Sequence, residues 1–473
     1  MLVAMFIGRK TELKILNHLL QKRIASLIVI RGRRRIGKSR LATEFGKPHS
    51  LIALAGLAPK EDTTAQMERN DFAGQMSRAL NMPLVKTEDW GDLFWHLAEQ
   101  TKNKRHVILM DEIQWMGRLD PTFLGKLKNA WDMLFSKNNK LILILSGSLA
   151  GWIEENIITD TGFLGRISLD IQLKELSLVE CNEFWGKNDT IAPFEKLKSL
   201  CVTGGVPKYL EELIPKETAE QNIKRLCFSP GGFLVSEFDN IFSDLFSKKN
   251  VIYRRIVKQL AQGPKGPVKI AASMGSQKSG TLSKYLEDLL KAGFISRDFT
   301  WHLKNGKPSK LSHFRLSDNY VRFYLKYIDP IRDKIQKGAL TQVPAWYSIM
   351  GLQFENCVLN NRPLIWNALQ IDSNEIESDN PFFQTKKAAR QGCQIDYLIQ
   401  TRFNILYACE IKFHQRELGT GVISDMKKKL AALALPRGFS VRPVLLHVNG
   451  VSDAVREDGY FSNIISFGDL LIG

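Results

Sequence analysis

The chain has 473 residues, 44% hydrophobic and 24% charged, a balance that suits several folded domains and excludes global disorder. Its formal net charge of +17 favours an acidic polymer, nucleic acid first, as a partner. The six cysteines lack C-x-x-C spacing and the apolar runs are no longer than strands, so neither a zinc site nor a membrane span is indicated, and we expect a cytoplasmic protein without membrane contact.

The first part of the chain alternates helical and buried-strand patterns. A helix is expected at residues 11–23 and a strand at 25–30, followed by a glycine-rich loop and a helix at 38–45. Further buried strands are expected at 107–110 and 141–145. Apolar strands between helices predict an α/β fold with a parallel sheet covered on both faces.

The glycine-rich loop matches G-x-x-x-x-G-K-[ST], the P-loop motif. Its glycines let the backbone turn successive N–H groups towards phosphates, and the following helix offers its positive N-terminus to an anion. Lys38 would reach the β and γ oxygens, and Ser39 would ligate Mg²⁺. The residues expected to contact ATP here are Gly32, Arg33, Arg34, Arg35, Ile36, Gly37, Lys38, Ser39 and Arg40.

Polar residues end the next two buried strands. Asp111 is expected to hold Mg²⁺ through water, and Glu112 to polarise the attacking water; a helix-capping pair is the alternative. The third strand ends in Ser146-Gly147-Ser148, where Ser146 is expected to touch the γ-phosphate or the attacking water, and an ordinary turn is the alternative. With Lys38, these residues predict a site that hydrolyses ATP.

These segments resemble a prokaryotic ATPase family known from archaea, within the AAA+/STAND group of P-loop proteins. The resemblance rests on Phe6-Ile7-Gly8-Arg9, the P-loop, Met110-Asp111-Glu112-Ile113-Gln114, Leu145-Ser146-Gly147-Ser148, Gly165-Arg166, and Thr203-Gly204-Gly205-Val206-Pro207-Lys208-Tyr209-Leu210.

The resemblance implies roles for residues outside the P-loop. Gly8 and Arg9 would lie near the adenine, and Pro207 would sit in a helical lid over the nucleotide; plain helix capping is the alternative for the lid segment. Arg166 would be an arginine finger, acting within its own chain or on a neighbouring subunit, with a structural turn arginine as the alternative. We expect an ATPase core at residues 1–172 and the lid at 173–245.

The middle of the chain, residues 246–340, is strongly basic. Between positions 248 and 310 stand fourteen Lys or Arg and three acids, a net charge of +11. Three helices and then a hairpin, with strands at 294–300 and 312–316, are the order of a winged helix. The residues expected to face DNA are Gln277, Lys278, Ser279, Thr281 and Lys284 on a recognition helix at 276–292, and Lys304, Lys307 and Lys310 on the wing. A protein-contact module is the alternative.

The last part, residues 341–473, carries an ordered set of charged residues. Glu355 is expected on a helix, Asp396 on a strand, and Glu410 and Lys412 on the same side of the next strand. Asp396 and Glu410 could hold a second divalent metal, and Lys412 could orient a hydroxide or stabilise a pentacovalent phosphate.

The order helix, strand, strand resembles the PD-(D/E)XK nuclease core, in which many domains are inert. Ile395 replaces the signature proline, and Gln394 stands where many relatives have Glu. The alternative for Glu410 and Lys412 is a surface ion pair of little energetic value.

Taken together, the sequence predicts an ATP- and Mg²⁺-dependent AAA+ ATPase that binds DNA, with a candidate metal-dependent nuclease domain at its end. The rival hypothesis is a STAND-type switch that acts through protein partners and whose last domain is inert. Homo-oligomers are compatible with both. A chaperone-like remodeller would need an axial pore loop, and none is identifiable.

Overall fold

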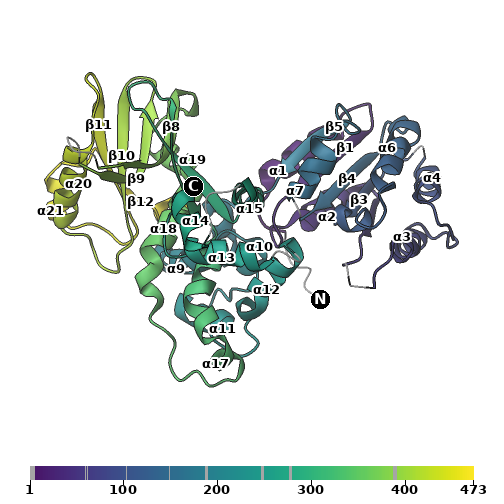
Figure 1. Ribbon diagram of the computed structural model, residues 1–473, viewed down its shortest axis with the longest axis horizontal. Coiled ribbons are helices and arrows are strands. Elements are labelled where there is room, and N and C mark those ends of the chain that lie inside the picture. Colours follow the sequence, from purple (N-terminus) through teal and green to yellow (C-terminus); the bar gives the residue numbers. More distant parts are fainter. Residues whose placement is uncertain are drawn as a thin grey trace. The chain divides into compact units, whose positions relative to one another are not determined.

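The computed structural model describes residues 6–58, 60, 62–102, 104–148, 150–186, 190–246, 250–275, 280–386 and 391–472. The chain forms two compact units, Met1–Leu176 and Ser177–Gly473, coloured purple to blue and blue-green to yellow in Figure 1. Within the described ranges, no helix is long and apolar enough to cross a bilayer.

The first unit is built on a parallel five-stranded sheet, which confirms the predicted α/β class. Its strands are β1 (Ser26–Arg31), β2 (Leu51–Ala55), β3 (Val107–Asp111), β4 (Ile142–Gly147) and β5 (Ile167–Gln172). Their spatial order is β2-β3-β4-β1-β5. Because β4 pairs with both β1 and β3, the carboxyl ends of these three strands lie side by side.

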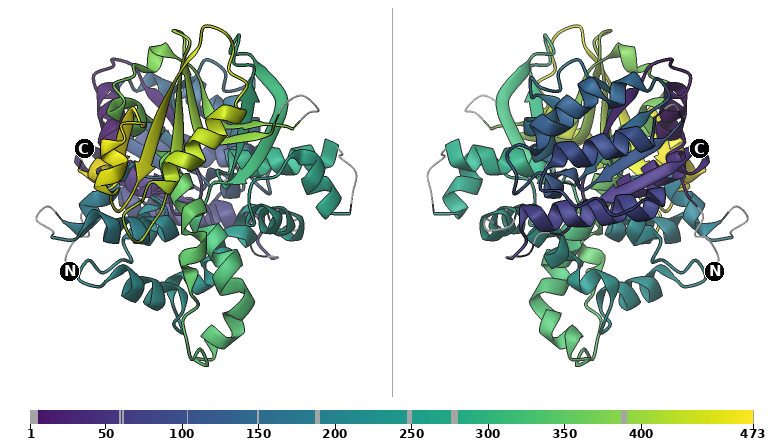
Figure 2. Two further views of the ribbon diagram at one scale, coloured as in Figure 1. Left: turned by 90° about the vertical axis from the view of Figure 1, so that its left-hand side faces the viewer. Right: turned by 90° about the vertical axis from the view of Figure 1, so that its right-hand side faces the viewer.

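Helices cover both faces of this sheet, as the right-hand view of Figure 2 shows for one face. They are α1 (Lys10–Leu19), α2 (Lys38–Gly46), η1 (Lys47–His49), α3 (Ala65–Leu80), α4 (Trp90–Gln100), α5 (Ile113–Met116), α6 (Phe123–Met133), η2 (Phe135–Lys137), α7 (Ala150–Ile153) and the π-helical η3 (Glu154–Ile158). Alternate residues of β1 face opposite sides: Ile28 packs with α1 and α2, and Val29 with α3, α4 and α6.

The second unit begins with helices and a two-stranded hairpin. The helices before the hairpin are α8 (Leu178–Asn182), η4 (Glu183–Trp185), α9 (Pro193–Thr203), α10 (Pro207–Leu210), α11 (Ala219–Cys227), α12 (Phe233–Phe246), α13 (Asn250–Leu260), α14 (Pro267–Ser273) and α15 (Gly280–Lys291). The hairpin joins β6 (Ile295–Trp301) to β7 (Pro308–Leu316). After it come α16 (Asn319–Phe323), η6 (Tyr324–Ile328), η7 (Asp329–Ile331), α17 (Arg332–Gln336) and η8 (Trp346–Ile349).

The order α13, α14, α15, hairpin agrees with the predicted elements, and the winged-helix interpretation stays a prediction. Of the predicted recognition helix, Gln277, Lys278 and Ser279 lie outside the described residues. Thr281 and Lys284 are exposed on α15.

The unit ends in a mixed five-stranded sheet. Its elements are α18 (Met350–Asn360), α19 (Arg362–Ala368), η9 (Ser373–Glu375), β8 (Ile376–Gln384), β9 (Cys393–Thr401), β10 (Ile405–Lys412), α20 (Gly421–Ala432), β11 (Ser440–His447), α21 (Asp453–Glu457), β12 (Asn463–Ser466) and η10 (Asp469–Leu471). The order is β12-β11-β10-β9-β8, antiparallel from β8 to β10 and parallel from β10 to β12.

The hairpin shares a core with this sheet. Trp301 and Leu303 are buried in the cluster that contains Leu398 and Leu406, and Trp301 Nε1 donates a hydrogen bond to Gln400 Oε1 at 2.6 Å. The hairpin is therefore fixed along the sheet instead of projecting as a free wing.

Candidate functional site

The loop after β1 needs glycine at two positions. Gly32 has φ 155°, and a Cβ there would lie 2.7 Å from the carbonyl oxygen of Leu173. Gly37 has φ 91° and precedes the first turn of α2. Arg35 is also left-handed, with φ 69°. A backbone of this kind turns its N–H groups towards an anion at the N-terminus of the helix.

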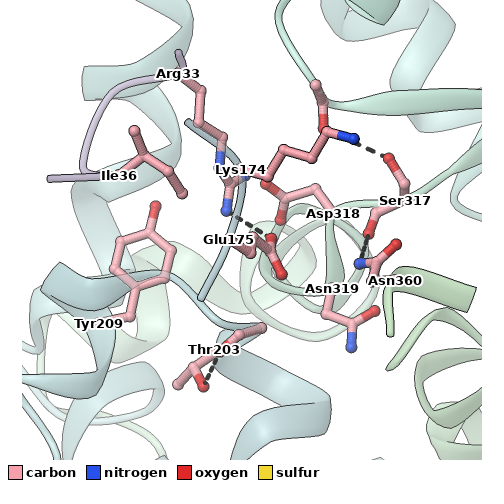
Figure 3. A network of polar contacts seen from close by, with 12 residues as sticks. Arg33, Ile36, Lys174, Glu175, Thr203, Tyr209, Ser317, Asp318, Asn319 and Asn360 are labelled. Atoms are coloured by element: carbon pink, nitrogen blue, oxygen red, sulfur yellow. Dashed lines mark hydrogen bonds and ion pairs between the residues drawn. The ribbon is translucent and has the colours of Figure 1, made fainter. Parts of the chain in front are cut away.

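Two buried arginines brace this loop, Arg9 from outside it and Arg33 from within it. The guanidinium of Arg9 donates to the carbonyl oxygens of Ile36 (3.0 Å) and Lys174 (2.6 Å). Arg33 pairs with Glu175 at 2.9 Å, drawn as a dashed line in Figure 3. Ile36 is completely buried, so its contribution to the loop surface comes from its backbone. The predicted proximity of Arg9 to the adenine stays a prediction.

Lys38 is a buried cation at the first position of α2. Its Nζ donates to the carbonyl oxygen of Arg33 at 3.2 Å. Burial lowers the pKa of Lys38, whereas the nearby carboxylates of Glu112 and Asp111 act in the opposite direction. A poorly hydrated ammonium is stabilised by an anion, which fits a phosphate held by the loop. Ser39, the next residue, is exposed at the same helix end, where a hydroxyl ligand to Mg²⁺ would be needed.

The carboxylate of Glu112 is held through one of its two oxygens. Oε2 accepts hydrogen bonds from the hydroxyl (2.8 Å) and the backbone N–H (3.2 Å) of Ser148 and from the amide of Gln114. Glu112 is itself left-handed, with φ 50°, so β3 ends in a sharp turn after Asp111. In the described part of the chain, Oε1 of Glu112 accepts no hydrogen bond. That oxygen can therefore orient a water molecule.

Ser146 and Ser148 have different surroundings. Ser146 is fully buried in β4, opposite Ile30 of β1, and its hydroxyl has no hydrogen-bond partner among the described residues. Ser148 follows β4 and reaches Glu112. Sequence reasoning preferred Ser146 and assigned no role to Ser148 or Gln114. The positions of Ser148 and Gln114 could have indicated their role, because both residues are polar and follow the ends of neighbouring strands.

Arg166 lies at the amino ends of the strands, opposite the carboxyl ends that carry the loop. It directly precedes β5, whose first residue pairs with Leu27 and whose last residue pairs with Arg31, next to the loop. The intervening strand measures about 17 Å at 3.3 Å per residue. Arg166 forms a two-bond ion pair with Asp132 of α6, at 2.7 and 2.9 Å. Hydrogen bonds from Arg166 and then from a lysine lower the pKa of Asp132 to about 2.

Pro207, the predicted lid residue, belongs to the second unit. It is the first residue of α10, after the Gly204-Gly205 turn and the N-cap residue Val206, and Gly204 has φ 62°. The local geometry is that of a helix end followed by a helix start with proline at N1. Its role over the nucleotide stays a prediction.

The charged residues of the last sheet form one cluster. Glu410 is completely buried and lies 2.8 Å from Lys412 Nζ through Oε1 and 2.5 Å from Lys429 Nζ through Oε2. Lys429, on α20, also lies 3.2 Å from Asp396 Oδ1. The second oxygen of Asp396 accepts the backbone N–H of Ile411 at 3.0 Å.

The pKa values in this cluster are shifted. Burial, and then the charge of Asp396, raise the pKa of Glu355 to about 7, with Arg315 and Arg322 opposing. The pKa of Asp396 is raised by burial and then by Glu410. The four predicted residues are thus electrostatically coupled.

Lys429 was missed by sequence reasoning. It follows Met426 by one helical turn on the buried stripe of α20, where a charge is unexpected. Across the described ranges, no group of three or more His, Cys, Asp or Glu side chains is arranged to hold a metal. Instead, the Lys429 ammonium stands between the carboxylates of Asp396 and Glu410.

Comparisons with known proteins bear on the first of these two sites. Residues 6–213 match a family described as an ATPase domain predominantly from Archaea. The chain is 28% identical over 358 residues to the uncharacterized protein MJECL04 of Methanocaldococcus jannaschii, covering 74% of this chain and 76% of that protein.

Two solved structures from archaea are also similar. The Walker-type ATPase PABY2304 of Pyrococcus abyssi is 19% identical with a TM-score of 0.52, covering 68% of this chain and 96% of its own. The ORC2 protein of Aeropyrum pernix is 16% identical with a TM-score of 0.43, covering 72% and 96%. Residues 6–213, which contain the P-loop, are thus similar to an ATPase domain found predominantly in Archaea.

Proposed function

We propose that the chain is an AAA+-type ATPase that binds DNA and uses its nucleotide cycle to control that contact. The observation that carries the proposal is the convergence of a buried Lys38 with Asp111 and Glu112 beside a glycine-dependent loop. Residues 173–245, with Pro207, would form the lid of this site.

The chemistry follows from the placement of these side chains. Lys38 would neutralise charge on the transferred phosphoryl group, and the free oxygen of Glu112 would orient the attacking water. Mg²⁺, held by Ser39 and Asp111, would supply charge neutralisation at the β and γ oxygens. Ser148 and Gln114 would keep Glu112 in the required orientation.

Charge and exposure support DNA as the partner. The net charge is +17, and the exposed side chains of the basic middle segment include Lys284 on α15 and Lys304, Lys307 and Lys310 on the hairpin. Lysines on an exposed element suit phosphate contacts that hold DNA without reading its sequence.

The acid–lysine cluster supports a nuclease as the finer proposal. The order α18, β8, β9, β10, α20, β11 agrees with the resemblance to the PD-(D/E)XK core. Asp396 and Glu410 supply carboxylate oxygens, the ligands that Mg²⁺ and Ca²⁺ prefer. A second metal there would have to displace Lys429, and Lys412 would remain to stabilise charge on a phosphate.

One observation favours a second candidate, the STAND-type switch with an inert last domain. Two lysines, Lys412 and Lys429, already neutralise the two carboxylates of Asp396 and Glu410. An electrically balanced cluster of this kind can serve to stabilise the fold alone. In that case the partner that reads the nucleotide state would be a protein.

Assays of ATPase activity and DNA cleavage on one sample, with and without each ligand, test these proposals. Glu112→Gln should bind ATP and lose turnover. If the domain cuts DNA, Asp396→Asn and Lys412→Ala should stop cleavage with Mg²⁺ or Mn²⁺. Asp425→Asn, an exposed change on α20, should not affect it. Equal cleavage in all four samples would reject the nuclease, and DNA-independent ATPase activity without DNA binding would favour the switch.

A further inference from the structure

A small cleft lies where the hairpin meets the edge of the last sheet. Its volume is about 180 Å³, and we call it the hairpin cleft. It is lined by Phe299, Thr300, Trp301, Pro308, Ser378 and Asn380. Its walls therefore combine aromatic rings from β6 with a hydroxyl and an amide from β8.

One of these rings, Phe299, is in contact with a planar cation. Phe299 is 37% exposed, and the guanidinium of Arg297 lies 4.7 Å from the centre of its ring. Arg297 is held in this position because its Nε donates to Ser312 Oγ at 3.1 Å, and it also lies 5.5 Å from the ring centre of Phe314. The result is a flat, fixed surface open to solvent.

The exposed charges of the hairpin have one sign. Its residues 295–316 include five Lys or Arg and a single acid. That acid, Asp298, is buried and paired with Arg315 at 3.0 Å. The remaining cations are exposed, and none has an ion-pair partner within the described ranges: Arg297, Lys304, Lys307 and Lys310. A fitting occupant therefore carries negative charge beside a flat apolar ring.

Trp301, one of the residues that line the hairpin cleft, packs on the side of the sheet that carries the acid–lysine cluster. Trp301 bonds Gln400, which pairs with Leu406 on β10. Leu406 and Glu410 are four residues apart and point to the same side of β10. At 3.3 Å per residue, Leu406 and Glu410 are about 13 Å apart along the strand.

We propose that the hairpin cleft binds an unpaired base of single-stranded DNA. The base would stack on Phe299, with Ser378 and Asn380 at its edge and the hairpin lysines on the neighbouring phosphates. In duplex DNA the base faces are covered by their neighbours, so a stacking platform favours strands with unpaired bases. This inference rests on the proposed DNA-binding function and defines the form of DNA that is bound.

The test compares a fluorescently labelled single strand of mixed sequence with the matching duplex, using the full chain and anisotropy at fixed salt. The parent should bind the single strand more tightly. Because base–aromatic stacking contributes about 1–3 kcal/mol per base, Phe299→Ala should weaken single-strand binding by about 5- to 150-fold. Phe299→Trp should preserve it, and duplex binding should change little in either variant.

Phe403→Ala is the matched control. Phe403 is 56% exposed on the turn after β9 and also carries a stacked arginine, Arg402, at 5.1 Å. The Phe403→Ala variant should bind single-stranded DNA with the same affinity as the parent. Equal melting temperatures would show that Phe299→Ala is folded, and quenching of a 2-aminopurine base by the parent but not by Phe299→Ala would report stacking directly.

The outcomes distinguish a failure of this inference from a failure of the proposed DNA-binding function on which it rests. If Phe299→Ala binds single strands as the parent does, or if Phe403→Ala loses as much affinity, the hairpin cleft is not the base site, although DNA binding stands. If the parent prefers duplex, the inference also fails. If the parent binds neither form of DNA, the proposed DNA-binding function fails with it.

Discussion

Replacement of Ser148 by alanine tests how the proposed water-orienting carboxylate is held. The substitution removes the 2.8 Å hydrogen bond from the Ser148 hydroxyl to Glu112 Oε2. It leaves the backbone N–H bond at 3.2 Å and the bond from Gln114. The Glu112 carboxylate should then rotate over a wider range, and its free oxygen should be correctly placed for a smaller fraction of the time.

The expected fall in kcat follows from the strength of the hydrogen bond that is removed. A hydrogen bond to a charged acceptor contributes about 1.5–3 kcal/mol, which corresponds to about 10- to 150-fold in rate if it acts in the transition state. Since two donors remain, we expect kcat to fall by about 10- to 50-fold. The affinity for ATP should not change, because Lys38 and the loop are untouched.

Ser146→Ala is the matched control, two residues earlier in the same chain segment. Its hydroxyl is buried without a partner among the described residues, so its removal should leave kcat unchanged and could raise the free energy of unfolding by roughly 1 kcal/mol. Steady-state phosphate release and ATP titration on both variants give the comparison. A parental kcat for Ser148→Ala, or an equal fall for Ser146→Ala, would refute this account of Glu112.

Three further predictions concern other parts of the two sites. Lys38→Ala should weaken ATP binding by about 1.5–3 kcal/mol, and unchanged affinity in calorimetry would mean that the nucleotide binds elsewhere. If Arg166 is an arginine finger that acts on a neighbouring subunit, a mixture of Arg166→Ala with Lys38→Ala should recover ATPase activity that each lacks alone, because Arg166 lies at the opposite end of β5 from its own loop; no recovery at any protein concentration would leave it as a partner of Asp132. Because the pKa of Glu355 is raised to about 7 in the folded protein, the folded state holds the Glu355 proton more tightly than the unfolded state. The stabilisation from this difference is complete below pH 4.5 and is lost as pH rises through 7. Glu355→Gln should therefore exceed the parent in unfolding free energy by up to about 3 kcal/mol at pH 8, with the difference shrinking towards pH 5; a difference independent of pH in denaturant titrations would contradict this.

Buried strands were predictable because burial on both faces demands continuous apolar residues. β1, β3 and β4 are central in the first sheet and were found within one or two residues. β2 and β5 are its edge strands. Polar residues interrupt the apolar run of β5 (ISLDIQ), whereas β2 (LIALA) is an unbroken apolar run that the sequence analysis did not assign. In β5, Asp170 pairs with Arg31 of the neighbouring strand, an interaction that makes sense only once the two strands are adjacent.

The site residues were predictable where they follow one another along the chain. They were not predictable where their role depends on contacts between residues that are far apart in the sequence. The P-loop residues follow one another along the chain, so their spacing is diagnostic. The hydrogen bonds of Glu112 to Ser148 join residues 36 positions apart, and Lys429 reaches Glu410 from a different element. Both contacts are set by strand order and helix packing, which the sequence pattern does not determine.

Contacts between the hairpin and α18 bear on how the second unit would use DNA. Arg315 of β7 pairs with Asp298 of β6 and also donates to Asn356 of α18, one residue beyond Glu355. Asn356 in turn donates to the carbonyl oxygen of Leu316 at 2.9 Å. Breaking one member of a buried network leaves unpaired polar groups at a cost of several kcal/mol, so the hairpin is held firmly against the helix that carries Glu355.

This rigidity constrains the mechanism. A strand bound at the hairpin would meet the acid–lysine cluster in a fixed register, with no hinge between the two within this polar network. Control by ATP would then act on whether DNA is admitted to the second unit, and not on the spacing between its base site and its carboxylates. Under this scheme, nucleotide should change the DNA affinity of Asp396→Asn as much as that of the parent, because the substituted carboxylate belongs to the rigid body that DNA approaches.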